Sequence, residues 1–129
     1  MTPRFVAPLR SLAAAEGLRV RVSGQCMNPH LQDGMLVDLT PASVYWPGDV
    51  VAFVNEARRL VAHRVIGYRP GFRGLRLWTQ ADSASRPDAP VAPRLVLGRV
   101  VMPIPFVARC RAAQRLARHL LWRLRARGR

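Results

Sequence analysis

The chain contains no lysine: all 21 of its basic residues are arginine, against seven acidic residues, and its formal charge is +14. Any reaction that needs a neutral amine as base must therefore use another group, and histidine is the obvious substitute. The two cysteines form no disulfide framework of the kind that stabilises small secreted domains, so we expect a reducing, cytoplasmic compartment. No apolar run reaches the roughly 20 residues of a membrane-spanning helix, and the first residues lack the apolar core of a secretory signal. We expect no segment of the chain to span a membrane.

The 129 residues, half of them apolar, are enough for one domain with one core. Charge is distributed unevenly along this chain. Residues 105–129 carry eight arginines and no acid, which leaves 13 arginines against seven acids in residues 1–104. This asymmetry predicts an anionic surface as the partner of the C-terminal segment.

Apolar and polar residues alternate over much of the chain, which predicts a mainly β fold. Leu18, Val20 and Val22 share one face, with Arg19 and Arg21 on the other, as in a half-buried strand. Further strands are predicted at 35–39, 50–55, 60–68, 75–79 and 95–102, with turn residues between them. The segment 81–93 has three prolines and predicts a long irregular loop, the kind of segment that often carries function.

Two helices are predicted at the ends of the β domain. The first is a short helix over 8–16, ended by Gly17. The second is a basic amphipathic helix whose apolar residues recur at three- and four-residue spacing: Phe106, Cys110, Ala113, Ala117, Leu120, Leu121 and Leu124. Because Pro103 and Pro105 precede it, we divide the chain into a β domain, 1–102, and a helical segment, 103–129, with a hinge or linker between them.

Four short motifs occur in order within the β domain. They are Gly24-Gln25-Cys26-Met27-Asn28-Pro29, Pro47-Gly48-Asp49, His63-Arg64-Val65, and Thr79-Gln80-Ala81-Asp82 followed by Asp88. Together they resemble the four boxes of the signal peptidase I family, in the Ser-His type found in archaea and the endoplasmic reticulum. One box alone would be weak, but four in the same order are specific. The resemblance covers roughly residues 18–102 and implies the β fold shared by signal peptidases and self-cleaving repressors, without a cofactor.

The sequence departs from this family most clearly at Cys26, where the family has its nucleophilic serine. A thiol ionises with a pKa of about 8.5, far below that of serine, and a nearby imidazolium lowers it further. With no lysine in the chain, His63 is the base that the motif offers. Cys26 and His63 are therefore expected to form a Cys-His pair, although an inert thiol in an inactive relative, or a cysteine engineered into a serine enzyme, would give the same residue.

Asp82 and Asp88 are the candidates for orienting His63, because a carboxylate on one ring nitrogen fixes the tautomer and stabilises the imidazolium. The sequence does not decide between them. We expect one to orient His63 and the other to hold the loop or to pair with Arg64 or Arg86.

The remaining elements of the predicted site lie around the nucleophile. The backbone N–H of Cys26, with the Ser23 hydroxyl as a weaker candidate, would hold the oxyanion. By resemblance, a peptide substrate lies as an extended strand beside the strand that leads to Cys26, where Met27 and Pro29 contact it. Cys26, His30 and His63 could be imagined as metal ligands, but the usual paired-cysteine spacing is absent, and no metal is expected.

The sequence predicts an endopeptidase that removes a leader, signal or pro-segment through a thioester acyl-enzyme. The alternative left open is an inactive relative that keeps only peptide binding. A self-cleaving repressor fits less well, because those proteins use a lysine base. For the C-terminal helix we favour an anionic membrane surface over a protein partner or a solvated tail, which would make the protein peripheral at the inner face of the membrane. Nucleic acid binding is not expected, since aromatic residues that could stack on bases are sparse.

Overall fold

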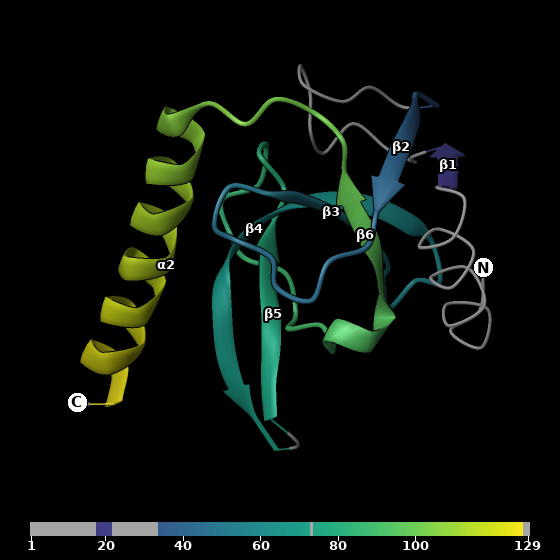
Figure 1. Ribbon diagram of the computed structural model, residues 1–129. Helices are drawn as coiled ribbons and strands as arrows, with labels where there is room; N and C mark the ends of the chain where they lie inside the picture. Colours follow the sequence, from purple (N-terminus) through teal and green to yellow (C-terminus); the bar gives the residue numbers. More distant parts are fainter. Residues whose placement is uncertain (1–17, 22–33, 73, 128–129) are drawn as a thin grey trace.

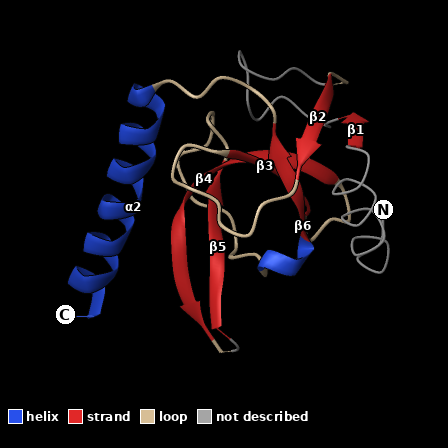
Figure 2. Cartoon of the chain, in the orientation of Figure 1, coloured by secondary structure: helices blue, strands red, loops and turns tan. Residues whose placement is uncertain are grey.

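A computed structural model describes residues 18–21, 34–72 and 74–127 of the chain. It is mainly β, as predicted: six antiparallel strands form one sheet, and a long α-helix lies to one side of it (Figures 1 and 2). The elements are β1 (Leu18–Arg21), β2 (Leu36–Thr40), β3 (Val50–Val54), β4 (Leu60–Gly71), β5 (Gly74–Gln80), the 3-10 turn η2 (Pro93–Leu95), β6 (Val96–Val100) and α2 (Phe106–Arg127). The strand order is β1-β2-β6-β3-β4-β5.

The strands fall where alternation predicted them, to within a few residues at their ends. The main difference is the β4–β5 hairpin, in which pairing continues to Gly71 and Gly74, past the residues read as a turn. Pro70 is tolerated within β4 because β3 pairs with β4 only as far as Arg64, so that further along β4 has one neighbouring strand instead of two. The helix predicted at 8–16 lies outside the described residues.

Strand β3 is buried on both of its faces. Val50, Ala52 and Val54 belong to one apolar cluster, which includes residues of β2 and β6, and Val51 and Phe53 belong to a second cluster on the other side. A continuous apolar run of five residues is what such a strand requires. Because β3 pairs with β4 through residues 60–64, the part of β4 that carries the H-R-V motif lies on a rigid support.

The helix α2 packs directly on the sheet, where Ile66 of β4 and Trp78 of β5 meet Ala112 and Leu116. The segment between the sheet and α2, where we expected a hinge or linker, therefore leads to a helix that contacts the sheet. Among the described residues, no helix combines the length and the apolar content that crossing a membrane requires.

Two glycines allow this close approach. A Cβ on Gly48 would lie 2.9 Å from the Cα of Arg109, and a Cβ on Gly67 would lie 2.6 Å from Leu116 Cδ2. Both glycines have positive φ, +99° and +157°, which side chains other than glycine rarely adopt. The glycine of the P-G-D motif thus serves to receive the C-terminal helix.

Candidate active site

His63 and Asp88 form a hydrogen-bonded pair on the side of the sheet that carries Phe53 of β3. His63 projects from β4 opposite Val51, and its Nδ1 lies 2.5 Å from Asp88 Oδ2. The side chain of His63 is 10% exposed, and Phe53 packs edge-on against its ring, with 5.6 Å between ring centroids. The ring is held on one side by the aromatic residue and at Nδ1 by the carboxylate.

Asp88 is itself fixed by contacts to the adjacent strand β5. Thr79 Oγ1 donates to Asp88 Oδ2 at 2.7 Å, and the backbone N–H of Asp88 donates to the Thr79 carbonyl at 2.8 Å. Trp78 Nε1 donates to the carbonyl of Asp88 at 3.1 Å. Although Asp88 lies in an irregular loop, these three bonds hold its carboxylate in position.

The pairing sets the tautomer of His63. An ionised carboxylate can only accept hydrogen bonds, so Nδ1 carries the proton and Nε2 of the neutral ring presents its lone pair. Nε2 is buried and has no hydrogen-bond partner among residues 18–21, 34–72 and 74–127. A buried nitrogen without a partner is costly in a purely structural histidine. The arrangement is the one that a general base requires.

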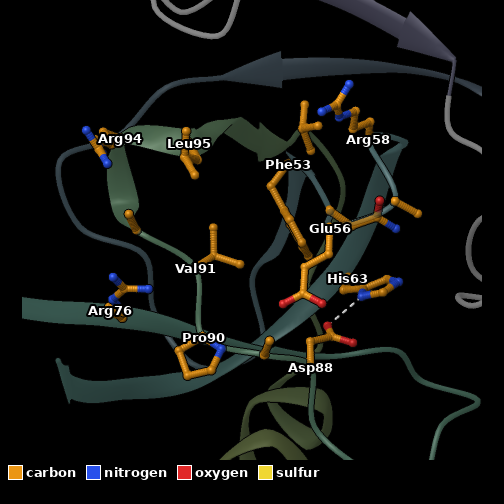
Figure 3. Close-up of a pocket in the computed structure, with 15 residues that line it drawn as sticks. Phe53, Glu56, Arg58, His63, Arg76, Asp88, Pro90, Val91, Arg94 and Leu95 are labelled. Carbon is orange, nitrogen blue, oxygen red and sulfur yellow. Dashed lines mark hydrogen bonds and ion pairs between the residues drawn. The ribbon is translucent and has the colours of Figure 1, made fainter. Parts of the chain in front are cut away.

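A pocket of about 590 Å³ opens beside the His63–Asp88 pair (Figure 3). Its walls come from the end of β3, the turn into β4, and the segment 88–95. Most of the described lining is apolar, for example Phe53, Val91 and Leu95. Three arginines, Arg58, Arg76 and Arg94, also line the pocket, together with the acidic residues Glu56 and Asp88. The pocket can receive a side chain or a short extended segment next to the histidine.

Asp82 occupies a different position from Asp88. It forms a bidentate ion pair with Arg64, whose Nε and Nη2 donate at 2.8 and 2.9 Å, and Arg64 Nη1 donates to the Gly48 carbonyl at 2.8 Å. Successive side chains of a strand point to opposite faces, so Arg64 and His63 diverge. The expectation of one role for each aspartate agrees with this geometry: Asp88 contacts His63, and Asp82, a catalytic candidate from sequence, pairs with Arg64 instead.

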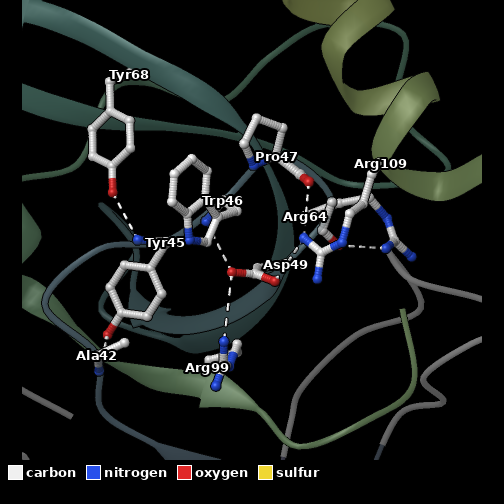
Figure 4. A network of polar contacts seen from close by, with 10 residues as sticks. Ala42, Tyr45, Trp46, Pro47, Asp49, Arg64, Tyr68, Arg99 and Arg109 are labelled. Carbon is white, nitrogen blue, oxygen red and sulfur yellow. Dashed lines mark hydrogen bonds and ion pairs between the residues drawn. The ribbon is translucent and has the colours of Figure 1, made fainter. Parts of the chain in front are cut away.

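The third motif residue with a carboxylate, Asp49, is the centre of a buried polar network (Figure 4). Its Oδ2 accepts the backbone N–H of Trp46 at 2.9 Å, and its Oδ1 accepts Arg109 Nη1 at 3.1 Å. Arg99 lies 4.0 Å from the same carboxylate. The P-G-D motif therefore ties the sheet to α2, and its aspartate is a structural residue.

The predicted nucleophile Cys26 lies outside the described residues, as do Ser23, Met27, Pro29 and His30. The structure thus brings His63, the predicted base, together with Asp88, and leaves the nucleophile, oxyanion and substrate-contact assignments as predictions.

Sequence reasoning missed the functions of Thr79 and Phe53 in holding Asp88 and His63. Thr79 is the first residue of its motif, and a hydroxyl nine residues before Asp88 is the signal that could have identified it. Phe53 gave no such signal, because any apolar residue would satisfy the pattern of β3.

Within the described part of the chain, no group of three or more histidine, cysteine, aspartate or glutamate side chains is arranged to hold a metal ion. Comparison with protein-family models finds no match, and comparison with curated proteins finds none either.

Proposed function

We propose that this chain is an endopeptidase of the signal-peptidase type, in which Cys26 is the nucleophile, His63 its base and Asp88 the residue that orients His63. The proposal combines the four motifs with one observation: His63 binds a fixed carboxylate through Nδ1 and has a buried Nε2 with no partner among the described residues. A histidine with only a packing role would not need that combination.

In the acylation step, His63 Nε2 takes the proton of the Cys26 thiol, and the thiolate attacks the scissile carbonyl carbon. The backbone N–H of Cys26, with the Ser23 hydroxyl, would stabilise the resulting oxyanion. The imidazolium then donates its Nε2 proton to the leaving amine as the C–N bond breaks, which leaves a thioester on Cys26. The negative charge of Asp88 stabilises the imidazolium throughout.

In the deacylation step, neutral His63 removes a proton from a water molecule, and the hydroxide attacks the thioester carbonyl. The C–S bond breaks, and the proton returns from His63 to the Cys26 sulfur. The acyl fragment leaves as a carboxylic acid, and both residues recover their starting protonation states. No cofactor takes part in either step.

The substrate in this proposal is a protein or peptide whose leader, signal or pro-segment is removed in an extended conformation, with Met27 and Pro29 in contact with it. The pocket beside His63 favours a segment that combines apolar and acidic side chains, because Arg76 and Arg94 line it and neither has an ion-pair partner among the described residues. The proposed location is cytoplasmic, at the inner face of the membrane.

The reactivity of Cys26 tests this proposal without knowledge of the substrate. Cys110 is exposed and would react with any alkylating agent, so the measurement uses the Cys110→Ser protein, in which Cys26 is the only thiol. At pH 6.5, two units below its ordinary pKa of about 8.5, a free thiol is only about 1% ionised. We expect Cys26 to react with iodoacetamide at least about tenfold faster than such a thiol, and the His63→Ala variant to lose this advantage.

His30→Ala is the matched control, because His30 is also close to Cys26 in sequence and is not assigned a role in the reaction. We expect it to leave the alkylation rate unchanged. The proposal is wrong if Cys26 reacts at pH 6.5 no faster than a free thiol and the loss of His63 has no effect on the rate. If the rate depends on His30 instead, the assignment of the base is wrong.

A further inference from the structure

The side of α2 that faces the protein is the less apolar one. Its contacts with the sheet are made by Ala112 and Leu116, by Arg109 on Asp49, by Arg115 on the carbonyls of residues 81 and 82, and by His119 on Gln80. These bonds, together with the close approach at Gly48, fix the rotation of the helix about its own axis. The face that α2 turns outward is therefore set by the fold.

That outward face carries the apolar stripe predicted from the sequence. All seven of its residues are exposed: Phe106, Cys110, Ala113, Ala117, Leu120, Leu121 and Leu124. The four largest side chains of the stripe, Phe106, Leu120, Leu121 and Leu124, are 81%, 43%, 54% and 65% exposed. A helix that packed by its apolar stripe would bury these residues, whereas here α2 packs on the sheet through Ala112 and Leu116 and leaves the stripe exposed. Contiguous exposed apolar surface of this kind indicates an interaction site.

A line of positive charge runs beside the stripe. Arg111, Arg118 and Arg125 recur every seven residues, which places them along one side of the helix. All three are exposed, and none has a hydrogen-bond or ion-pair partner among the described residues. The whole helix contains seven arginines and no acidic residue. A partner that matches this face must offer an apolar phase and anionic groups side by side.

We propose that this face of α2 binds the surface of a membrane containing anionic phospholipid, with the axis of the helix parallel to the bilayer. The apolar stripe enters the boundary between head groups and acyl chains, and the three arginines contact the phosphates. Trp122, which is 70% exposed, adds a residue that favours this boundary. Nucleic acid would bind the arginines through its phosphates but would leave the apolar stripe exposed to water. Membrane binding by α2 does not depend on the proposed peptidase activity.

Co-sedimentation of the full chain with vesicles tests this inference. We expect the protein to bind vesicles of equimolar phosphatidylcholine and phosphatidylglycerol, and to bind vesicles of phosphatidylcholine alone at least about tenfold more weakly, since each basic residue near an anionic leaflet changes partition about fivefold. The Arg111→Gln/Arg118→Gln variant should lower partition into anionic vesicles about 25-fold. Arg59→Gln/Arg86→Gln removes the same charge at exposed positions outside α2 and should change partition less than about threefold.

The apolar contribution is tested in the same assay. Leu121→Ser/Leu124→Ser should lower partition by roughly 20- to 30-fold, because each side chain loses part of its burial in the bilayer. The control Leu36→Ser/Leu75→Ser alters two leucines of similar exposure, 49% and 62%, in β2 and β5, and should bind as the unmodified chain does. Since all four leucines are exposed, circular dichroism should show that every variant folds.

The inference is overturned if the stripe variant binds anionic vesicles as well as its control does, or if both vesicle types bind the chain equally. It is also overturned if the chain does not bind vesicles of either type and instead binds duplex DNA or RNA, and the Arg111→Gln/Arg118→Gln variant loses that binding.

Discussion

The two aspartates that the sequence could not distinguish provide a matched pair of substitutions. Asp88→Asn keeps the size of the side chain but removes the charge that faces His63 Nδ1 at 2.5 Å. Hydrogen bonds to charged groups contribute roughly 1.5–3 kcal/mol and neutral ones about half of that, so the imidazolium loses about 0.8–1.5 kcal/mol of stabilisation. At about 1.4 kcal/mol for each factor of ten, alkylation of Cys26 at pH 6.5 should fall about 4- to 12-fold.

Asp82→Asn should have the opposite effect: it should lower the stability of the protein and leave the alkylation rate of Cys26 nearly unchanged. It removes the charge of a bidentate pair whose side chains are 7% exposed at Arg64 and 18% at Asp82, and leaves the guanidinium partly uncompensated. Loss of one partner of a fully buried pair costs about 3–5 kcal/mol, and the partial exposure of Asp82 reduces the expected cost to roughly 2–3 kcal/mol. The melting temperature should fall by about 8–12 °C, while the alkylation rate changes less than about twofold.

Both variants are measured in the Cys110→Ser background, with the melting temperature followed by circular dichroism and the alkylation rate by mass spectrometry. The Asp88 side chain is 26% exposed, against 18% for Asp82, and its partner His63 is a weaker ion than an arginine. Asp88→Asn should therefore cost at most about 1 kcal/mol of stability. The reasoning is refuted if Asp82→Asn slows alkylation as much as Asp88→Asn does, or if the two variants have the same profile.

Three further perturbations probe the helix contact and the pocket. Gly48→Ala should lower the free energy of unfolding by about 2–4 kcal/mol, and Gly74→Ala by about 1 kcal/mol. Both glycines have positive φ, but only Gly48 lies against the helix. Equal losses for the two variants in urea unfolding would disprove the contact. Burial lowers the pKa of His119 below its ordinary value, and nearby arginines lower it further, so its contribution to stability is complete above pH 6.5 and is lost as the pH falls towards the lowered pKa. The urea midpoint should therefore fall between pH 7 and 5 by more in the unmodified chain than in His119→Gln, and identical slopes would count against this. Finally, Arg76→Gln/Arg94→Gln should raise KM at least about threefold for peptides with an acidic residue near the cleavage site and leave KM for neutral peptides unchanged, since the lost interaction is between charges.

The strands could be predicted because their signal is local. Alternation in 18–21 and 36–40 matches one buried and one exposed face, and the unbroken apolar run of β3 matches burial on both. The position of His63 on a strand followed in the same way. Period-two geometry also explains why His63 and Arg64, adjacent in the motif, meet different aspartates.

What the sequence could not predict depends on contacts between distant segments. The choice of Asp88 over Asp82 depends on Thr79 and Trp78, which hold the loop so that the first carboxylate reaches the ring. The side of α2 that faces the sheet could not be predicted either. The apolar periodicity identifies one stripe, whereas the polar contacts of Arg109, Arg115 and His119 decide which side of the helix packs on the sheet. Side-chain anchors of this kind have no periodic pattern.

Cleavage of a peptide library tests the central claim most directly. Peptides generated from a whole-cell digest are incubated with the unmodified chain, with Cys26→Ala and with His63→Ala, and new termini are identified by mass spectrometry. The account predicts a consistent set of internal cleavages with the unmodified chain, and none with either variant. Cleavage that survives in Cys26→Ala, or peptides that are bound by all three proteins and cut by none, would contradict it.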